Sequence, residues 1–263
     1  MEVGYSSVQV PGKKLSIVGA RPFSQGGRHW RNEETEFYKE IYGMDGFQMS
    51  AERIAKNIAQ QPAPNAVVVL AHNGPTGLGD RPFDICGQDW GGRNRDAAHA
   101  LDPISDHGDP DLQEALLLAH HQGRGPALVV FGHMHSQLQG RGLRRMVAVN
   151  TRETPGTIYL NSATVPRIRR VPHHLLGAAG PPSEGVPLMR HFCLVHLVGG
   201  CVTSASEVWI RVMDRSTGAC QRVCEHTLVA EAQAGNSGSR GSGDSGPTPS
   251  LQGTSQQGTS RSK

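Results

Sequence analysis

The sequence lacks several features that would assign it to a broad class of protein. It has no run of about 18 consecutive apolar residues, so no segment is expected to span a membrane. Its first 19 residues have neither the apolar core of a signal peptide nor the Arg- and Ser-rich amphipathic character of a transit peptide. We therefore expect a soluble protein with no visible targeting segment and no membrane partner.

Net charge and paired cysteines are also scarce. A net charge of +3 over 263 residues is too small to indicate nucleic-acid binding by itself, although residues 141–145 and 167–170 are locally basic. Five cysteines at irregular spacings disfavour a disulfide framework and favour a reducing compartment, and we expect ordinary thiols. Nucleic acid is not expected as a partner, and the oligomeric state is open.

Glycine and proline, by contrast, are abundant, with 33 and 17 residues, which indicates a loop-rich domain. Short β-branched stretches bounded by Gly, Pro or polar residues predict buried strands at 15–19, 66–71, 127–131, 146–149 and 157–161. Helical spacing predicts helices at 33–43, 50–60 and 109–123, the second with Ser50 as its N-cap and the third with an acidic cap. Residues 191–200 and 205–214 predict a β-hairpin.

This order of elements predicts an α/β fold. Helices alternate with strands in the first part of the chain and strands follow alone, which favours an α/β sandwich over a single parallel sheet. We expect one domain over residues 1–230, with a loop insertion at 173–187. Residues 231–263 are a Gly/Ser-rich, low-complexity tail that is expected to be disordered.

Two histidines follow a predicted strand in the stretch LVVFGHMHSQL, residues 128–138. Residues i and i+2 of a strand point to the same side, so His133 and His135 leave the carboxyl end of the strand together. Neutral imidazoles that converge there suit a divalent transition metal. The alternative is that one histidine caps the strand and the other faces solvent. His72 follows the preceding predicted strand, 66–71, in the same manner, and this second histidine favours the metal site.

Several sequence blocks carry a resemblance. They are VGARPFSQGG (18–27), AHNGPTGLG (71–79), DICGQDW (84–90), DHGDPDL (106–112), VVFGHMH (129–135) and NSATVPRI (161–168). Over residues 3–212 the chain resembles calcineurin-like metallophosphoesterases, and most closely a subfamily from cyanobacteria and plant plastids. The resemblance implies an α/β/β/α sandwich, incomplete on its N-terminal side, in the cytoplasm or the plastid (chloroplast) stroma.

The resemblance also implies an activity. Members of the family hydrolyse phosphate mono- or diesters with a metal-bound hydroxide, and hold two divalent metal ions, here Mn, Fe, Zn or Mg. By resemblance, His72 and His133 would bind one metal and His135 the other. Weaker candidates for substrate or outer contacts are Asn73, His107, Asp109, Asn161 and Arg167.

The weaker candidates have ordinary alternatives. The block DHGDPDL is also typical of a turn followed by a helix N-cap, and loop asparagines commonly serve turns. Arg167 and Arg21 are suited to bind a phosphate group, but each could equally form a surface ion pair. The consecutive histidines His120–His121 and His173–His174 are expected to be exposed.

The chain departs from the family before His72. The blocks aspartate–x–histidine, glycine–aspartate–x–x–aspartate and glycine–asparagine–histidine are absent, and with them the bridging aspartate, the asparagine ligand and the histidine that assists catalysis. We therefore expect the C-terminal part of a phosphoesterase without a complete active site, which is prone to aggregate because its sheet is incomplete. The alternative is a non-catalytic scaffold of the same fold; a nucleic-acid enzyme would rest on the arginine runs alone.

Overall fold

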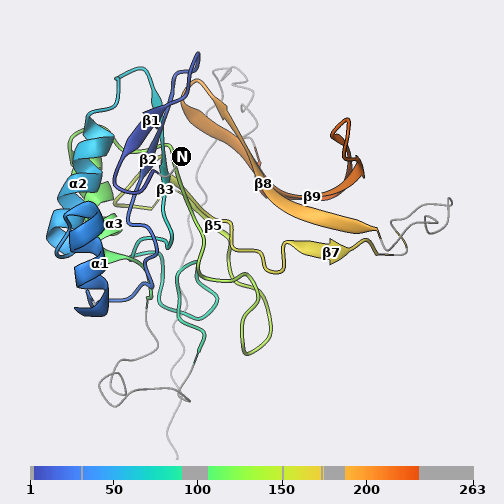
Figure 1. The fold of residues 1–263 in the computed structure, drawn as a ribbon, viewed down its shortest axis with the longest axis horizontal. Helices are drawn as coiled ribbons and strands as arrows, with labels where there is room; N and C mark the ends of the chain where they lie inside the picture. The colour runs from blue at the N-terminus through green and yellow to red at the C-terminus, as the bar shows by residue number, and fades with distance from the viewer. Residues whose placement is uncertain are drawn as a thin grey trace, which may run out of the picture. The chain divides into compact units, whose positions relative to one another are not determined.

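Two β-sheets form the frame of the protein (Figure 1). The computed structural model describes residues 3–30, 32–90, 106–149, 151–172, 174 and 187–230, which belong to one unit, Met1–Glu231. The first sheet has the order β1-β2-β3-β4-β6-β5 and the second the order β10-β9-β8-β7. The strands are β1 (Ser7–Gln9), β2 (Leu15–Gly19), β3 (Ala66–Leu70), β4 (Leu128–Phe131), β5 (Val147–Val149), β6 (Ile158–Asn161), β7 (Ile168–Arg170), β8 (Leu188–Val198), β9 (Cys201–Asp214) and β10 (Ala219–Val229).

The first sheet is mixed. Its central strands β2, β3, β4 and β6 run parallel, and the edge strands β1 and β5 pair antiparallel with their neighbours. Parallel strands bring their carboxyl ends to one edge of a sheet, and ligands of open α/β sheets gather at that edge. The loops that follow β2, β3, β4 and β6 therefore meet there, which determines where a site can form.

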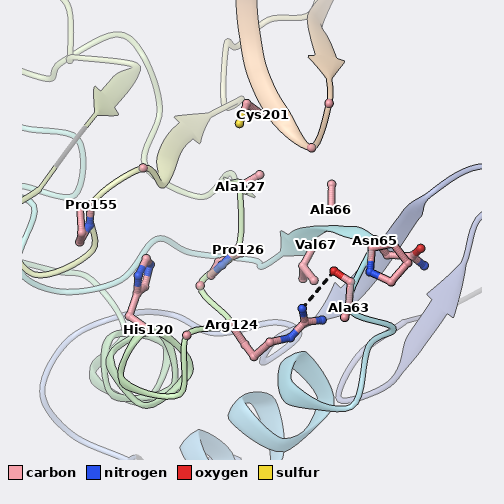
Figure 2. A pocket seen from close by; sticks show the side chains of 16 residues that line it. Ala63, Asn65, Ala66, Val67, His120, Arg124, Pro126, Ala127, Pro155 and Cys201 are labelled. Atoms are coloured by element: carbon pink, nitrogen blue, oxygen red, sulfur yellow. Dashed lines mark hydrogen bonds between the residues drawn. The ribbon is translucent and has the colours of Figure 1, made fainter.

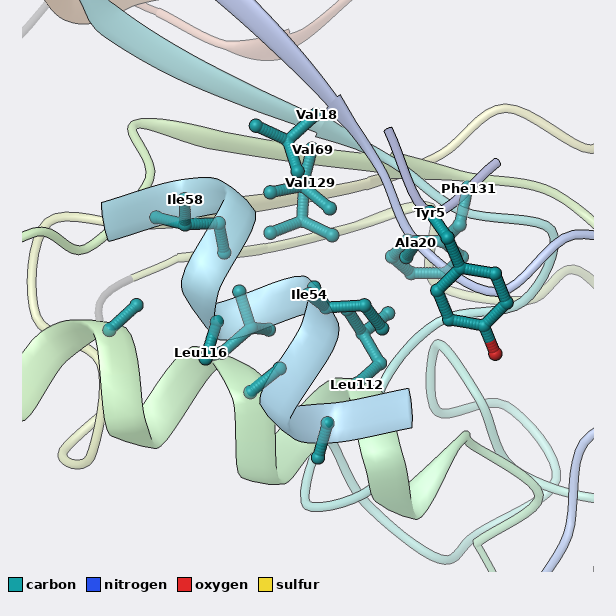
Figure 3. Packing of buried hydrophobic residues seen from close by; sticks show 14 of the residues in the cluster. Tyr5, Val18, Ala20, Ile54, Ile58, Val69, Leu112, Leu116, Val129 and Phe131 are labelled. Atoms are coloured by element: carbon teal, nitrogen blue, oxygen red, sulfur yellow. The ribbon is translucent and has the colours of Figure 1, made fainter. Parts of the chain in front are cut away.

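Three helices cover one face of this sheet: α1 (Asn32–Tyr42), α2 (Phe47–Ala59) and α3 (Pro110–His121). Ile54 of α2 and Leu112 of α3 are buried in one cluster with strand residues that include Val18, Val69 and Val129 (Figure 3). Burying a side chain of this size stabilises a fold by about 1.5–3 kcal/mol. The helix layer thus fixes the strands whose ends carry the site.

The second, antiparallel sheet packs against the other face of the first. Leu128 and Leu160 lie in a second apolar cluster together with Val195, Val202 and Val229 of the antiparallel sheet. Strands β3 and β4 are consequently covered on both faces, which explains their almost continuous apolar sequence. The protein is a mixed α/β structure, as predicted.

The five predicted strands are confirmed to within one residue at each end, and the hairpin is confirmed as β8 and β9. The N-cap prediction for Ser50 is wrong: α2 begins three residues earlier at Phe47 after Gly46, and Ser50 lies inside it, fully buried. Its hydroxyl is hydrogen-bonded to Tyr5 and Asp111. The tail at 231–263 and nearly all of the insertion at 173–187 lie outside the described residues. No helix of the described residues is long and apolar enough to cross a membrane.

Candidate histidine site

The structure brings His72 and His133 together. They follow the adjacent parallel strands β3 and β4, and their ring centroids are 5.0 Å apart. The two loops are tied by a hydrogen bond of 3.0 Å from the Gly132 amide to the His72 carbonyl. His133 has φ of 63°, in the left-handed region that few residues other than glycine adopt, and this sharp turn directs its ring toward His72.

His133 is neutral at physiological pH. Burial is the largest cause, and the neighbouring His72, His107 and His135 act in the same direction, so the pKa of His133 falls from 6.5 to about 4. An imidazole binds a metal through the lone pair of an unprotonated nitrogen, so a ring that stays neutral near pH 7 suits that role. His135 is exposed.

His107 joins the pair. Its ring stacks at 17° on that of His133 with centroids 6.3 Å apart, and the edge-to-face ring of Trp90 is 4.7 Å away. The block DHGDPDL therefore reaches the carboxyl edge of the sheet, where its candidate residue His107 must lie if it belongs to the site. Whether His107 contacts a substrate stays a prediction.

Two backbone carbonyls hold two of these three rings. The Ser24 carbonyl accepts a hydrogen bond from Nδ1 of His72, and the Gln25 carbonyl accepts one of 2.7 Å from Nε2 of His107. A carbonyl oxygen can only accept, so the proton of a neutral His72 is on Nδ1 and its Nε2 keeps a lone pair. Sequence reasoning missed both residues, because a carbonyl is present at every position.

Asp109 lies in a buried ion-pair network that contacts the loop of Ser24. Its Oδ1 is 2.8 Å from Nη2 of Arg21 and accepts a hydrogen bond of 2.5 Å from the Ser24 hydroxyl. Nε of Arg21 is 3.1 Å from Asp111, and all three charged residues are at most 2% exposed. Of the two alternatives for Arg21, a phosphate contact or a surface ion pair, the second is wrong in its place: Arg21 forms an ion pair, but a buried one. Burial raises the pKa of Asp109 although Arg21 opposes the rise.

The remaining candidates hold loops in place. Asn161 donates a hydrogen bond of 2.7 Å to the Met134 carbonyl, inside the turn that carries His133 and His135. Asn73 donates one of 2.8 Å to the His107 carbonyl, and its buried Oδ1 has no hydrogen-bond partner in the described part of the chain. Arg167 is exposed, and its Nη2 donates to the Ser162 carbonyl at 2.5 Å.

A separate cavity of about 480 Å³ lies at the amino-terminal ends of β3 and β4 (Figure 2). His120, Arg124 and Cys201 are among its lining residues.

The predicted exposure of His120 is wrong: its Nε2 is 2.8 Å from the Thr157 hydroxyl, and burial lowers its pKa. His121 and His174 are exposed as predicted, and His173 lies outside the described residues. All five cysteines are free thiols, also as predicted.

The side chains at this site supply the imidazole ligands of a metal centre but not its carboxylate ligands. His72 and His133 are suitable imidazole ligands, but the neighbouring carboxylates of Asp109 and Asp111 are engaged by Arg21. No group of three or more His, Cys, Asp or Glu side chains within the described ranges could hold a metal ion. A dinuclear centre needs carboxylate oxygens that this arrangement does not offer.

The chain matches no protein-family model and no curated protein.

Proposed function

We propose that the chain carries the histidine half of a two-metal phosphoesterase with a calcineurin-like α/β/β/α sandwich. The protein hydrolyses a phosphate mono- or diester, and the carboxylate ligands come from residues other than those described here. One observation carries the proposal. His72 and His133, from neighbouring parallel strands, have ring centroids 5.0 Å apart at the carboxyl edge of the sheet.

The state of the two rings supports this function. His72 donates through Nδ1, so Nε2 is its only nitrogen with a lone pair, and His133 is neutral because its pKa is about 4. Metal-binding histidines commonly donate their second nitrogen to a carbonyl in this way. His135 follows two residues later on the same turn. In this proposal it contributes to the second metal.

The test is hydrolysis of an aryl phosphate with Mn²⁺, in the protein as it is natively expressed, including any residues beyond these 263. His133→Ala should lower turnover by about 100-fold or more, since loss of a ligand weakens both metal binding and catalysis. His196→Ala is the control, because His196 is an exposed residue of β8. Turnover of His133→Ala within a factor of two of wild type would remove the assignment.

The alternative function is a non-catalytic scaffold. It is favoured by the engagement of Asp109 and Asp111 with Arg21, which leaves the imidazole pair without a nearby free carboxylate. A scaffold should bind Mn²⁺ no better than its His72→Ala variant in equilibrium dialysis. Tight, stoichiometric binding that His72→Ala abolishes would instead favour the enzyme.

A further inference from the structure

The loop after β2 holds two histidine rings by its main chain. Ser24 and Gln25 are consecutive, and their carbonyls accept hydrogen bonds from His72 and His107. These rings come from two separate loops, after β3 and before α3, and the His72 ring in turn lies beside that of His133. A displacement of this one segment would therefore turn two rings at once.

The Ser24 side chain fixes that segment. Its hydroxyl donates to Asp109 at 2.5 Å and accepts a hydrogen bond of 3.0 Å from the Gly26 amide. Asp109 is held in turn by Arg21, and the Asp109 amide donates to the Gly74 carbonyl at 2.7 Å. Ser24 is fully buried, so water does not compete for these bonds. The serine thus joins the first loop to the loops of His72 and His107.

The fit of this loop leaves little freedom. A Cβ on Gly26 would lie 2.3 Å from the His107 carbonyl oxygen and 2.5 Å from Nδ2 of Asn73. The backbone of the loop therefore touches both neighbouring loops directly. The carbonyls of Ser24 and Gln25 have a defined position, because this contact restricts the loop on one side and the Ser24–Asp109 hydrogen bond restricts it on the other.

We propose that Ser24 is a positioning residue of the histidine site: its hydroxyl, anchored on Asp109, sets the direction of the carbonyl that selects the Nδ1–H form of His72. Binding of a metal by Nε2 of His72 depends on the proposed function, whereas the tautomer of His72 does not depend on it. Ser24 makes no contact with a reacting atom in this account. It acts through His72.

The first measurement uses the wild-type protein. The ¹⁵N NMR signals of the histidine rings at pH 8, with His72 assigned from a His72→Gln variant, report which nitrogen carries the proton. His72 should be a single Nδ1–H tautomer. A His72 ring protonated on Nε2, or a mixture of the two tautomers, would overturn the proposal without any need for a Ser24 variant.

The second measurement compares Ser24→Ala with Ser16→Ala. Ser16 is a matched control, because it lies in β2 outside the site, is also fully buried, and its hydroxyl accepts a hydrogen bond of 3.0 Å from Nδ2 of Asn65. Ser24→Ala should produce a mixture of His72 tautomers and weaken Mn²⁺ binding by about 10–100-fold, the usual effect of losing an outer contact of a ligand. Ser16→Ala should change neither quantity.

The outcomes separate this proposal from the proposed function. An unchanged tautomer in a folded Ser24→Ala variant overturns the positioning role. A wild-type protein with the expected tautomer and its loss in Ser24→Ala supports that role, even if no phosphate ester is hydrolysed and the proposed function fails. If Ser24→Ala does not fold, a wild-type His72 ring that is not a single Nδ1–H tautomer still overturns the proposal.

Discussion

At the scale of single residues, the buried charge of Arg21 should be the least replaceable. Arg21→Met would leave Asp109 and Asp111 buried without their cationic partner, and removing one member of a buried ion pair typically costs about 3–5 kcal/mol. Arg145→Met is the control. Its side chain is 56% exposed and 3.9 Å from Asp84, so the expected cost is below about 1 kcal/mol. Urea unfolding measures both, and equal costs would contradict this account of the network.

A second residue-scale prediction concerns pH. His191, whose Nε2 lies 3.3 Å from Oε1 of Glu207, is the main cause that lowers the pKa of Glu207; burial opposes it, and Thr164 adds a hydrogen bond of 2.8 Å. A carboxyl group with a lowered folded-state pKa contributes stability above its ordinary pKa, here 4.5, and loses it as the pH falls through the folded value. The wild-type free energy of unfolding should therefore fall more steeply below pH 4.5 than that of Glu207→Gln.

The control for this titration is Glu52→Gln, since Glu52 is exposed on α2. Its stability curve should run parallel to that of the wild type. If Glu207→Gln also follows the wild-type curve through the acid range, the ionised Glu207 is not what His191 and Thr164 stabilise in the folded protein.

At the scale of elements, the close contact between loops can be tested with two glycines. Gly26 and Gly12 both have positive φ, 75° and 69°, so an alanine at either position carries a similar backbone strain of about 1 kcal/mol. Only at Gly26 would the new Cβ meet other atoms, since nothing lies within 4 Å of it at Gly12. Gly26→Ala should thus cost at least about 1 kcal/mol more than Gly12→Ala in urea unfolding, and similar losses would argue against the close packing of these loops.

Elements with a regular apolar pattern could be predicted from the sequence. The strand at 15–19 matches β2, and the other four strands differ by at most one residue. Strand β10, by contrast, was not predicted, because its residues are mostly exposed and have no apolar alternation. The start of α2 was misplaced because Ser50, a typical N-cap residue, serves instead as a buried hydrogen-bonding group.

The candidate site could be predicted only in part. That His72 and His133 meet follows from two strands that end in histidine, because adjacent parallel strands present their carboxyl ends together. The pairing of Arg21 with Asp109 spans 88 positions and has no local pattern. The carbonyls of Ser24 and Gln25 could not be singled out either, since every residue has the same acceptor and only the folded loop directs these two at imidazoles.

At the scale of the whole molecule, we predict self-association through one exposed surface, in addition to the tendency to aggregate that an incomplete sheet would cause. Along β8, exposed residues alternate with buried or half-buried ones, and the exposed set includes Phe192 at 48% and Val198 at 64% exposure. Other large apolar side chains on the same face are Leu188 and Leu194. Exposed apolar side chains of this kind promote association, and the energy gained by covering them is about 25 cal/mol per Å².

Phe192→Lys together with Val198→Lys should therefore reduce self-association, measured as the concentration dependence of the sedimentation coefficient. The free energy of unfolding should change by no more than about 1 kcal/mol, because both side chains are already largely exposed and a lysine stem can still cover the neighbouring apolar surface. His196→Lys adds a lysine to the same face without removing apolar area, so it should associate like the wild type. If His196→Lys also prevents association, added charge explains the effect and the apolar stripe of β8 does not.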